Sequence, residues 1–371
     1  MTNIQLLTRP EILDPEALHE FFDALTDYVP NIERDMARLG REPANRVVVA
    51  DIFRSLHNIK GDAALCRVET AVLIVHPIES MLTRLRSGEI AYSSLLGEVM
   101  LLALDRLELA TEALLAGRSI EHLRLVTLVE GLEQISLAGP QDIDATAIQL
   151  IKSVTGFQPR AVLHTLSEQP PVPALAPVSH VGDRAADLQL FHALAQQFEA
   201  RSPLFAGRTA RVLQLALDTN RAAGSPVDAV QLEAAACMHD VGMMFLPESI
   251  WLKVGKMSKT EHNRLHTHPG LTADLLDRMD GWQEAAQIVR QHHEKWDGSG
   301  YPDGLRGDAI CAGAKILAIV DAFEAVTLKH SSRGHKRSVL RAIAEVNACD
   351  RQFAPEWIEP FNGVIRHMLE Q

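Results

Sequence analysis

The sequence predicts an all-α protein. Long segments carry apolar residues at three- and four-residue spacing, and no segment shows the strict alternation that marks a half-buried strand. Prolines accumulate between residues 156 and 183, where the apolar periodicity fades, so this stretch predicts a linker. We therefore expect an N-terminal helical bundle at residues 1–117, a helical extension at 118–155, the linker at 156–183 and a second helical domain at 184–371.

The composition excludes several classes of protein. With 371 residues, 47% of them hydrophobic, the chain can bury more than one core. The net charge of −12 argues against a protein that binds duplex nucleic acid, because neutralising phosphates needs clustered Lys and Arg. The chain shows neither a secretory leader nor an apolar run near the ~20 residues of a membrane helix, and its four cysteines are scattered. We therefore expect a cytoplasmic protein without a membrane partner.

The segment Ile52–Leu65 predicts an amphipathic helix in the N-terminal bundle. His57 lies off its apolar stripe, toward solvent. The stripe itself consists of Ile52, Leu56, Ile59 and Ala63.

The face around His57 has features of a protein-docking site. Arg54 and Gly61 share this face, and Lys60 lies close by. A glycine inside a helix costs about 1 kcal/mol relative to alanine, so we interpret Gly61 as room for another protein to approach the imidazole. Arg54 and Lys60 would then neutralise a phosphoryl group carried by His57. An ordinary surface histidine beside a tolerated glycine is the alternative interpretation of this helix alone.

Buried polar residues in the second helical domain indicate a metal site. His239 and Asp240 interrupt an apolar run, and Asp321 lies in another. An isolated buried carboxylate costs several kcal/mol unless it is paired, and a dication is an economical partner. Nitrogen and oxygen ligands suit iron or manganese, with zinc, nickel and magnesium as alternatives. The expected ligands are His239, Asp240, His268, His292, His293 and Asp321. For the His239–Asp240 pair alone, a hydrogen-bonded core pair is the alternative.

The stretch from His292 to Pro302 is the most specific motif of the chain. Two adjacent imidazoles precede an acid-rich turn whose glycines let the backbone reverse sharply. If Asp240 bridged two metal ions, they would lower the pKa of a shared water and clamp phosphodiester oxygens for in-line hydrolysis. The pattern therefore predicts metal-dependent phosphoester chemistry.

With these motifs, residues Arg184–Gln371 resemble an HD-GYP domain, a branch of the HD phosphohydrolase superfamily. The resemblance implies a helical bundle with a bi- or trinuclear metal centre that hydrolyses cyclic di-GMP to its linear dinucleotide or to GMP. It assigns the six expected ligands to the metals and gives Gly300, Tyr301 and Pro302 the role of a substrate loop beside them. Downstream, Gln352–Pro355 resembles the family's closing segment.

The sequence departs from this family at three places. Arg208 stands where the family has its first ligand histidine, Met243 replaces a lysine, and Arg333-Gly334-His335 replaces an Arg-Pro-Tyr segment. An arginine cannot ligate a metal, and its fixed charge disfavours a dication nearby.

Arg208 therefore weakens one of two ligand sets. The set of His239, Asp240 and Asp321 loses affinity, whereas the set of Asp240, His268, His292 and His293 remains complete. Arg208 could replace part of the phosphate-binding charge lost at Met243, which makes it a candidate catalytic residue together with Asp240. A catalytically degenerate module that acts as a cyclic dinucleotide sensor or signalling adaptor is the alternative, and hydrolysis of another cyclic dinucleotide or phosphoester is a second one.

The N-terminal motifs resemble a histidine phosphotransfer domain over about Ile12–Gly117. The resemblance rests on His57-Asn58-Ile59-Lys60-Gly61 and the helix that follows. It implies a four-helix bundle with His57 as phosphoacceptor and a histidine kinase or receiver domain as partner. No ATP-binding motif is present, so the chain should not phosphorylate itself. Together the two resemblances predict a cyclic di-GMP phosphodiesterase regulated by a phosphorelay, and a homodimer stays open.

Overall fold

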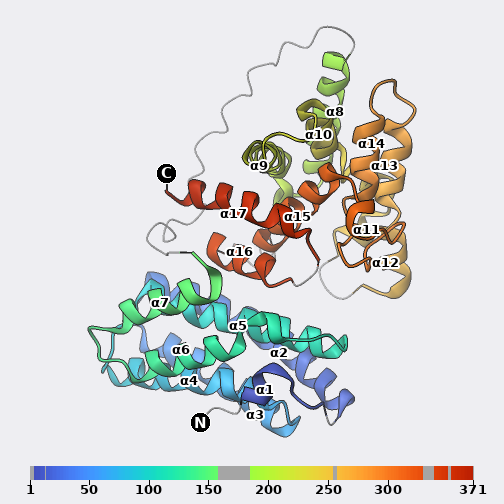
Figure 1. The fold of residues 1–371 in the computed structure, drawn as a ribbon. Coiled ribbons are helices and arrows are strands. Elements are labelled where there is room, and N and C mark those ends of the chain that lie inside the picture. The colour runs from blue at the N-terminus through green and yellow to red at the C-terminus, as the bar shows by residue number, and fades with distance from the viewer. Residues whose placement is uncertain are drawn as a thin grey trace. The chain divides into compact units, whose positions relative to one another are not determined.

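Every regular element that the structure describes is a helix, which confirms the predicted all-α class. The structure is a computed structural model, and it describes residues 4–12, 14–157, 184–253, 257–328, 338–349 and 352–370. The chain forms two units, Met1–Leu166 with Lys329–Ala348, and Ser167–Leu328 with Cys349–Gln371 (Figure 1). None of the helices so described combines the length and apolarity needed to cross a bilayer.

A four-helix bundle forms the core of the first unit. Its helices are α2 (Pro15–Arg41), α3 (Arg46–Leu65), α4 (Glu69–Ser87) and α5 (Ser94–Leu115). α3 packs on α2 and α4, and α2 also packs on α5. The predicted stripe of α3 is buried along its whole length, and tertiary burial of this kind supplies most of the stability of a helix in a protein.

Local signals in the sequence set the ends of these helices. Asp14 caps the start of α2 and Asn45 the start of α3, and each side chain accepts hydrogen bonds from two backbone N–H groups of the first turn. Gly88 ends α4 in the left-handed conformation, with a φ of 79°. The short connections that follow bring consecutive helices back against one another.

Further helices extend the bundle. α6 (Leu125–Leu137) packs on α4, and α7 (Ile143–Thr155) packs on α5 and α6. The short α1 (Ile4–Thr8) packs on α6, and a single 3-10 turn, η1 (Glu121–Leu123), packs on α5. Residues 118–155, expected as a helical extension, thus lie in the same unit as the bundle.

One helix from the C-terminal half of the chain also belongs to the first unit. α16 (Val339–Asn347) packs on α5 and α7. The sequence-based boundary at residue 184 assigns this helix to the second domain, and the structure differs there. Nothing in the local sequence of α16 distinguishes the two partners, because an apolar helix can bury its surface against either.

The second unit is built around α9 (Arg208–Ala222). This helix packs on α10 (Ala229–Met238), α15 (Ala312–Leu328) and α17 (Pro355–Glu370). In turn, α10 packs on α8 (Arg184–Glu199) and α14 (Gln283–Gln291), and α14 packs on α13 (His268–Leu276) and α15. The shorter elements are η3 (Pro203–Phe205), η4 (Val241–Phe245), α11 (Glu248–Trp251), α12 (Lys259–Leu265) and η5 (Gly307–Ala309).

Two sequence-based expectations fall outside the described residues. The linker at 156–183 is described only at Gly156, which ends α7 with a φ of 79°, and at Phe157, whose side chain is buried. The segment Arg333-Gly334-His335 is not described at all.

Candidate functional site

The predicted metal ligands come from three helix ends and one helix interior of the second unit. His239 follows α10 and Asp240 comes next, before η4. His268 opens α13, His292 and His293 follow α14, and Asp321 lies within α15. Because these helices pack on one another, the sequence-distant side chains meet in one place.

The backbone orients three of the imidazoles. In each ring, Nδ1 lies close to the carbonyl oxygen of the residue three positions earlier in the chain. The distance is 2.8 Å for His239, 2.7 Å for His268 and 2.6 Å for His292. A carbonyl only accepts, so each Nδ1 donates its proton. In a neutral ring Nε2 then keeps the lone pair with which an imidazole binds a metal.

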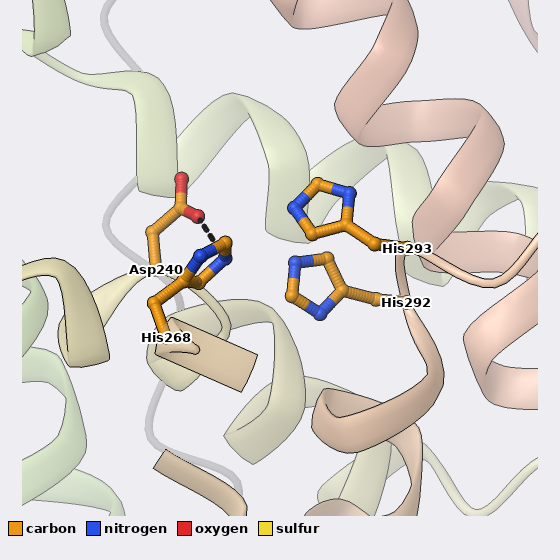
Figure 2. Close-up of side chains that lie close together, drawn as sticks. All are labelled: Asp240, His268, His292 and His293. Atoms are coloured by element: carbon orange, nitrogen blue, oxygen red, sulfur yellow. Dashed lines mark ion pairs between the residues drawn. The ribbon is translucent and has the colours of Figure 1, made fainter. Parts of the chain in front are cut away.

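Asp240, His268, His292 and His293 form a ligand set that can hold one ion. Figure 2 shows the carboxylate and the three rings facing one another, and one ligand atom from each lies within 4.8 Å of the others. Nε2 of His268 is 3.5 Å from Oδ1 of Asp240. Nε2 of His268 and of His292 are buried and have no hydrogen-bond partner among the described residues. Such orphaned polar atoms are costly unless a ligand binds them, and a divalent metal ion fits the set.

Charge in this set favours a cation. Burial lowers the pKa of His293 to about 4, and it lowers the pKa of His268 and, further, that of His292. All three rings are therefore neutral near pH 7 and need not lose a proton to bind a metal. Burial alone would raise the pKa of Asp240, but the neighbouring His239 and Arg208 hold it well below its ordinary value.

Arg208 occupies the second ligand set. One terminal nitrogen of its guanidinium donates to Asp240 and the other donates to Asp321. The first of these nitrogens also lies 3.4 Å from Nε2 of His239. The guanidinium is almost fully buried, as are the three residues it contacts. The position that a metal would take between His239, Asp240 and Asp321 therefore holds a fixed cation.

A positive charge on His239 further disfavours a metal ion in this second ligand set. Burial alone would lower its pKa, but the charge of Asp240 and hydrogen bonds to Asp240 and Asp321 raise it to about 9. Without a metal, a charged His239 and Arg208 thus balance two carboxylates. The residues of the second set do not fit a dication while Arg208 is present.

Gly242 allows the segment after His239 and Asp240 to lie directly against α13. A Cβ at this position would be 2.3 Å from the carbonyl oxygen of His268 and 2.6 Å from the hydroxyl of Thr272. The N–H of Gly242 donates to that hydroxyl at 2.8 Å. This close approach places Asp240 beside His268.

The predicted substrate loop is held against the paired histidines. Glu294, which follows them, is buried and accepts hydrogen bonds of 2.7 to 3.0 Å from three consecutive backbone N–H groups, those of residues 303–305. The N–H of Tyr301 donates to the carbonyl oxygen of His293 at 3.2 Å. Gly300 leaves the room for this turn, because its Cβ would lie 2.4 Å from the backbone nitrogen of Lys295.

Tyr301 also stacks on His266, a histidine for which we predicted no functional role. The rings of His266 and Tyr301 are 3.7 Å apart and nearly parallel, and His293 stacks on Tyr301 at 4.8 Å. His266 precedes the ligand His268 by two residues, so its spacing alone gave no signal. The closing segment joins the same region, because the N–H of Trp296 donates to the carbonyl oxygen of Gln352 at 3.0 Å.

His57 lies on the exposed face of α3, as predicted, and is fixed by a residue of α4. Its Nδ1 is 3.0 Å from one carboxylate oxygen of Glu79, whose other oxygen pairs with Lys60. The side chain of His57 is 64% exposed, whereas that of Glu79 is 7% exposed. With Nδ1 bound to Glu79, Nε2 is the nitrogen free to react with an incoming group.

The other residues predicted around His57 behave differently from one another. Arg54 pairs with Asp51 on its own helix, and nothing lies within 4 Å of the Cβ that Gly61 lacks, so the space in front of this glycine is open. Phe53, with Arg86 over its ring, stacks on His57. No role was predicted for Glu79, although a carboxylate in an apolar helix is the same signal that identified Asp240.

Replacing Gly242 by alanine tests the close approach at the metal site. Because the added Cβ must displace backbone atoms of His268, we expect Gly242→Ala to lower metal affinity by about 10–100-fold, as disturbed supporting contacts typically do. Isothermal titration with Mn²⁺ measures the affinity. Gly270→Ala is the matched control, since a Cβ there meets nothing within 4 Å. Equal affinity of the two variants would contradict the packing argument.

Metal stoichiometry tests the role of Arg208. We expect the purified wild-type chain to bind one metal ion and Arg208→His to bind two, because the substitution removes the fixed charge and adds an imidazole. Elemental analysis after saturation with Mn²⁺ and gel filtration gives the ratio. Arg221→His, at an exposed position of the same helix, should leave the ratio unchanged. Two ions in the wild type would show that Arg208 does not block the second set.

Comparisons with known proteins identify both parts of the chain. The HD domain family matches residues 192–356, and the Hpt domain family matches residues 16–117. The cyclic di-GMP phosphodiesterase response regulator RpfG of Xanthomonas campestris pv. campestris is 41% identical over 109 residues, which are 29% of this chain and 28% of that protein.

Two further relatives match a similar share of the chain. The 3'3'-cGAMP-specific phosphodiesterase 2 of Vibrio cholerae is 36% identical over 154 residues, or 40% of this chain and 29% of that protein. A cyclic di-GMP phosphodiesterase of Thermotoga maritima is 31% identical over 140 residues, which are 37% of this chain and 38% of that protein. The chain spans less than half the length of each of these relatives. The matches confirm both resemblances at the level of the domain families: residues 16–117 match the Hpt domain, and residues 192–356 match the HD domain.

Proposed function

We propose that this chain is a metal-dependent phosphodiesterase that hydrolyses a cyclic dinucleotide, with cyclic di-GMP as the first candidate. The observation that carries the proposal is the set of Asp240, His268, His292 and His293, in which two buried imidazole nitrogens have no hydrogen-bond partner among the described residues. The names of relatives that include cyclic di-GMP and 3'3'-cGAMP phosphodiesterases support the substrate class.

A dication bound to this set would supply Lewis-acid polarisation of the phosphodiester and activation of water. Iron or manganese suits three imidazoles and one carboxylate, with zinc, nickel and magnesium as alternatives. Asp240 has two tasks, because one oxygen faces His268 and the other accepts from Arg208. Arg208 holds Asp240 and Asp321 in their ionised forms and keeps a positive charge beside the ligand set. Its remaining N–H donors are the groups with which it would bind a phosphate.

The loop Gly300–Pro302 is proposed to border the substrate. It is fixed on one side by Glu294 and on the other by the ring of His266. A rigid loop of this kind loses little conformational entropy when a ligand binds.

A sensor without hydrolysis is the second candidate function. The observation that favours it is Arg208, which fills the second ligand set and so removes the metal that would complete a two-ion site. Met243, in place of a lysine, removes a further positive charge. Such a module would bind the dinucleotide and signal through its conformation.

Hydrolysis of cyclic di-GMP by the Mn²⁺- or Fe²⁺-loaded chain separates the two functions. We expect linear dinucleotide or GMP as product, and we expect Asp240→Asn to abolish turnover, because it removes the one anionic ligand of the set. Liquid chromatography follows the products, with 3'3'-cGAMP as a comparison substrate. If the chain binds both dinucleotides but hydrolyses neither when loaded with Mn²⁺ or with Fe²⁺, the phosphodiesterase function is excluded. A large gain of activity in the double variant Arg208→His, Met243→Lys would then identify the lost groups.

We further propose that His57 accepts a phosphoryl group from a histidine kinase or a receiver domain and so regulates the HD domain. The match of residues 16–117 to the Hpt family supports this role. Exposure of His57, its orientation by Glu79 and the open space in front of Gly61 support access by a protein partner. Lys60, held by Glu79, places a positive charge beside the imidazole.

Phosphotransfer to the full-length chain tests this role. We expect His57→Gln to abolish labelling by a phosphorylated receiver domain, and Glu79→Gln to slow it, because the amide holds the ring less firmly. His76→Gln, at an exposed position of α4, should be labelled as the wild type is. In ³¹P spectra the phosphoryl group should lie on Nε2. Labelling of His57→Gln at the wild-type rate would refute the assignment.

A further inference from the structure

α16 packs in the first unit of the structure, although its sequence lies within the segment that matches the HD domain. It falls inside residues 192–356, which match the HD domain, yet Lys329–Ala348 belong to the unit that contains the Hpt domain. The chain thus leaves the second unit after Leu328 and returns to it at Cys349. α15, before this excursion, carries Asp321, and α17 follows it.

Arg341 fastens α16 to the bundle. Its Nε and Nη2 atoms donate to the two carboxylate oxygens of Asp105 on α5, both at 2.7 Å, and Nη2 also donates to Glu33 on α2 at 2.6 Å. The arginine is 4% exposed, and both carboxylates are buried as well. A bidentate arginine pair of this kind fixes geometry as well as charge, and the low dielectric of a buried site makes the loss of one partner costly.

A second polar contact sets the register of α16. Ser338 caps the helix by accepting from the N–H of Arg341 at 3.2 Å, and its hydroxyl donates to Glu98. Glu98 and Asp105 are seven residues apart and so lie on one face of α5. Every residue of α16 from Val339 to Val346 is buried as well. α16 therefore docks in a single position.

This docking site is separate from the phosphoacceptor. α16 packs on α5 and α7, whereas His57 lies on α3, which packs on α2 and α4. A kinase or receiver domain can therefore reach His57 while α16 stays in place. A change in the packing of the bundle would reach α16 through α2 and α5, which hold Glu33 and Asp105.

We propose that α16 is a coupling helix: by binding Arg341 through Glu33 and Asp105, the Hpt bundle restrains the C-terminal end of α15 and with it Asp321, which pairs with Arg208 beside the candidate metal set. The regulated activity rests on the proposed function, but the coupling itself does not. Coupling between sites requires an element whose state both sites influence. α16 is the candidate for such an element, because it packs in the first unit, while α15 before it and α17 after it belong to the second.

Hydrogen–deuterium exchange of the full-length chain, without metal or substrate, tests the coupling. We expect Arg341→Met to speed exchange of the amides of α16 by about tenfold or more, and to speed exchange in residues 321–328 of α15 as well, since local opening sets both rates. Asp105→Asn keeps the shape of its side chain and should give the same pattern more weakly. Peptides from α10 should exchange as in the wild type.

Arg38→Met is the matched control, because it removes an exposed ion pair with Glu42 from the same unit. It should leave α15 and α16 unchanged. Faster exchange confined to α16 would overturn the coupling, and unchanged exchange in α16 would overturn the docking. Because no turnover is measured, a chain unable to hydrolyse a dinucleotide would still give a decisive result.

Discussion

Two buried aspartates, Asp240 and Asp321, impose the constraint on which the HD domain depends. A carboxylate out of water needs a cation close by, and here a guanidinium from α9 supplies one to both. On its other side Asp240 faces rings whose Nε2 atoms find no protein partner among the described residues. Asp240 thus belongs both to the set that Arg208 occupies and to the set of residues that could hold a metal ion.

The sequence predicted the parts of this arrangement that depend on local pattern. Apolar periodicity predicted the helices, and polar residues inside apolar runs pointed to the candidate metal ligands, because burying such groups needs a reason that can be stated without a structure. The sequence also predicted that Arg208 weakens the set of His239, Asp240 and Asp321, since an arginine cannot ligate a metal. Its simultaneous contact with two aspartates could not be predicted, because it depends on how α9, α10 and α15 pack.

Contacts between side chains that are far apart in the sequence could not be predicted from it. Glu79 fixes His57 from the next helix, and His266 stacks on a tyrosine 35 positions later. Arg341 binds Asp105 across 236 residues. A sequence shows that a carboxylate is buried but not which distant cation it meets. The packing of α16 on the first unit could not be predicted for the same reason, since helix propensity carries no information about partners.

The position of α16 bears on how such a chain can evolve. Families are commonly exchanged as whole modules by recombination in the linker between them. Here the N-terminal module is completed by a helix encoded inside the gene segment of the C-terminal one, so a crossover between codons 158 and 183 would separate Arg341 from the acids that bind it. We expect only a replacement bundle that offers acids at the positions of Glu33 and Asp105 to bind α16 as this one does. A chain that combines this C-terminal module with an unrelated bundle would bury Arg341 without the two carboxylates that neutralise its charge here.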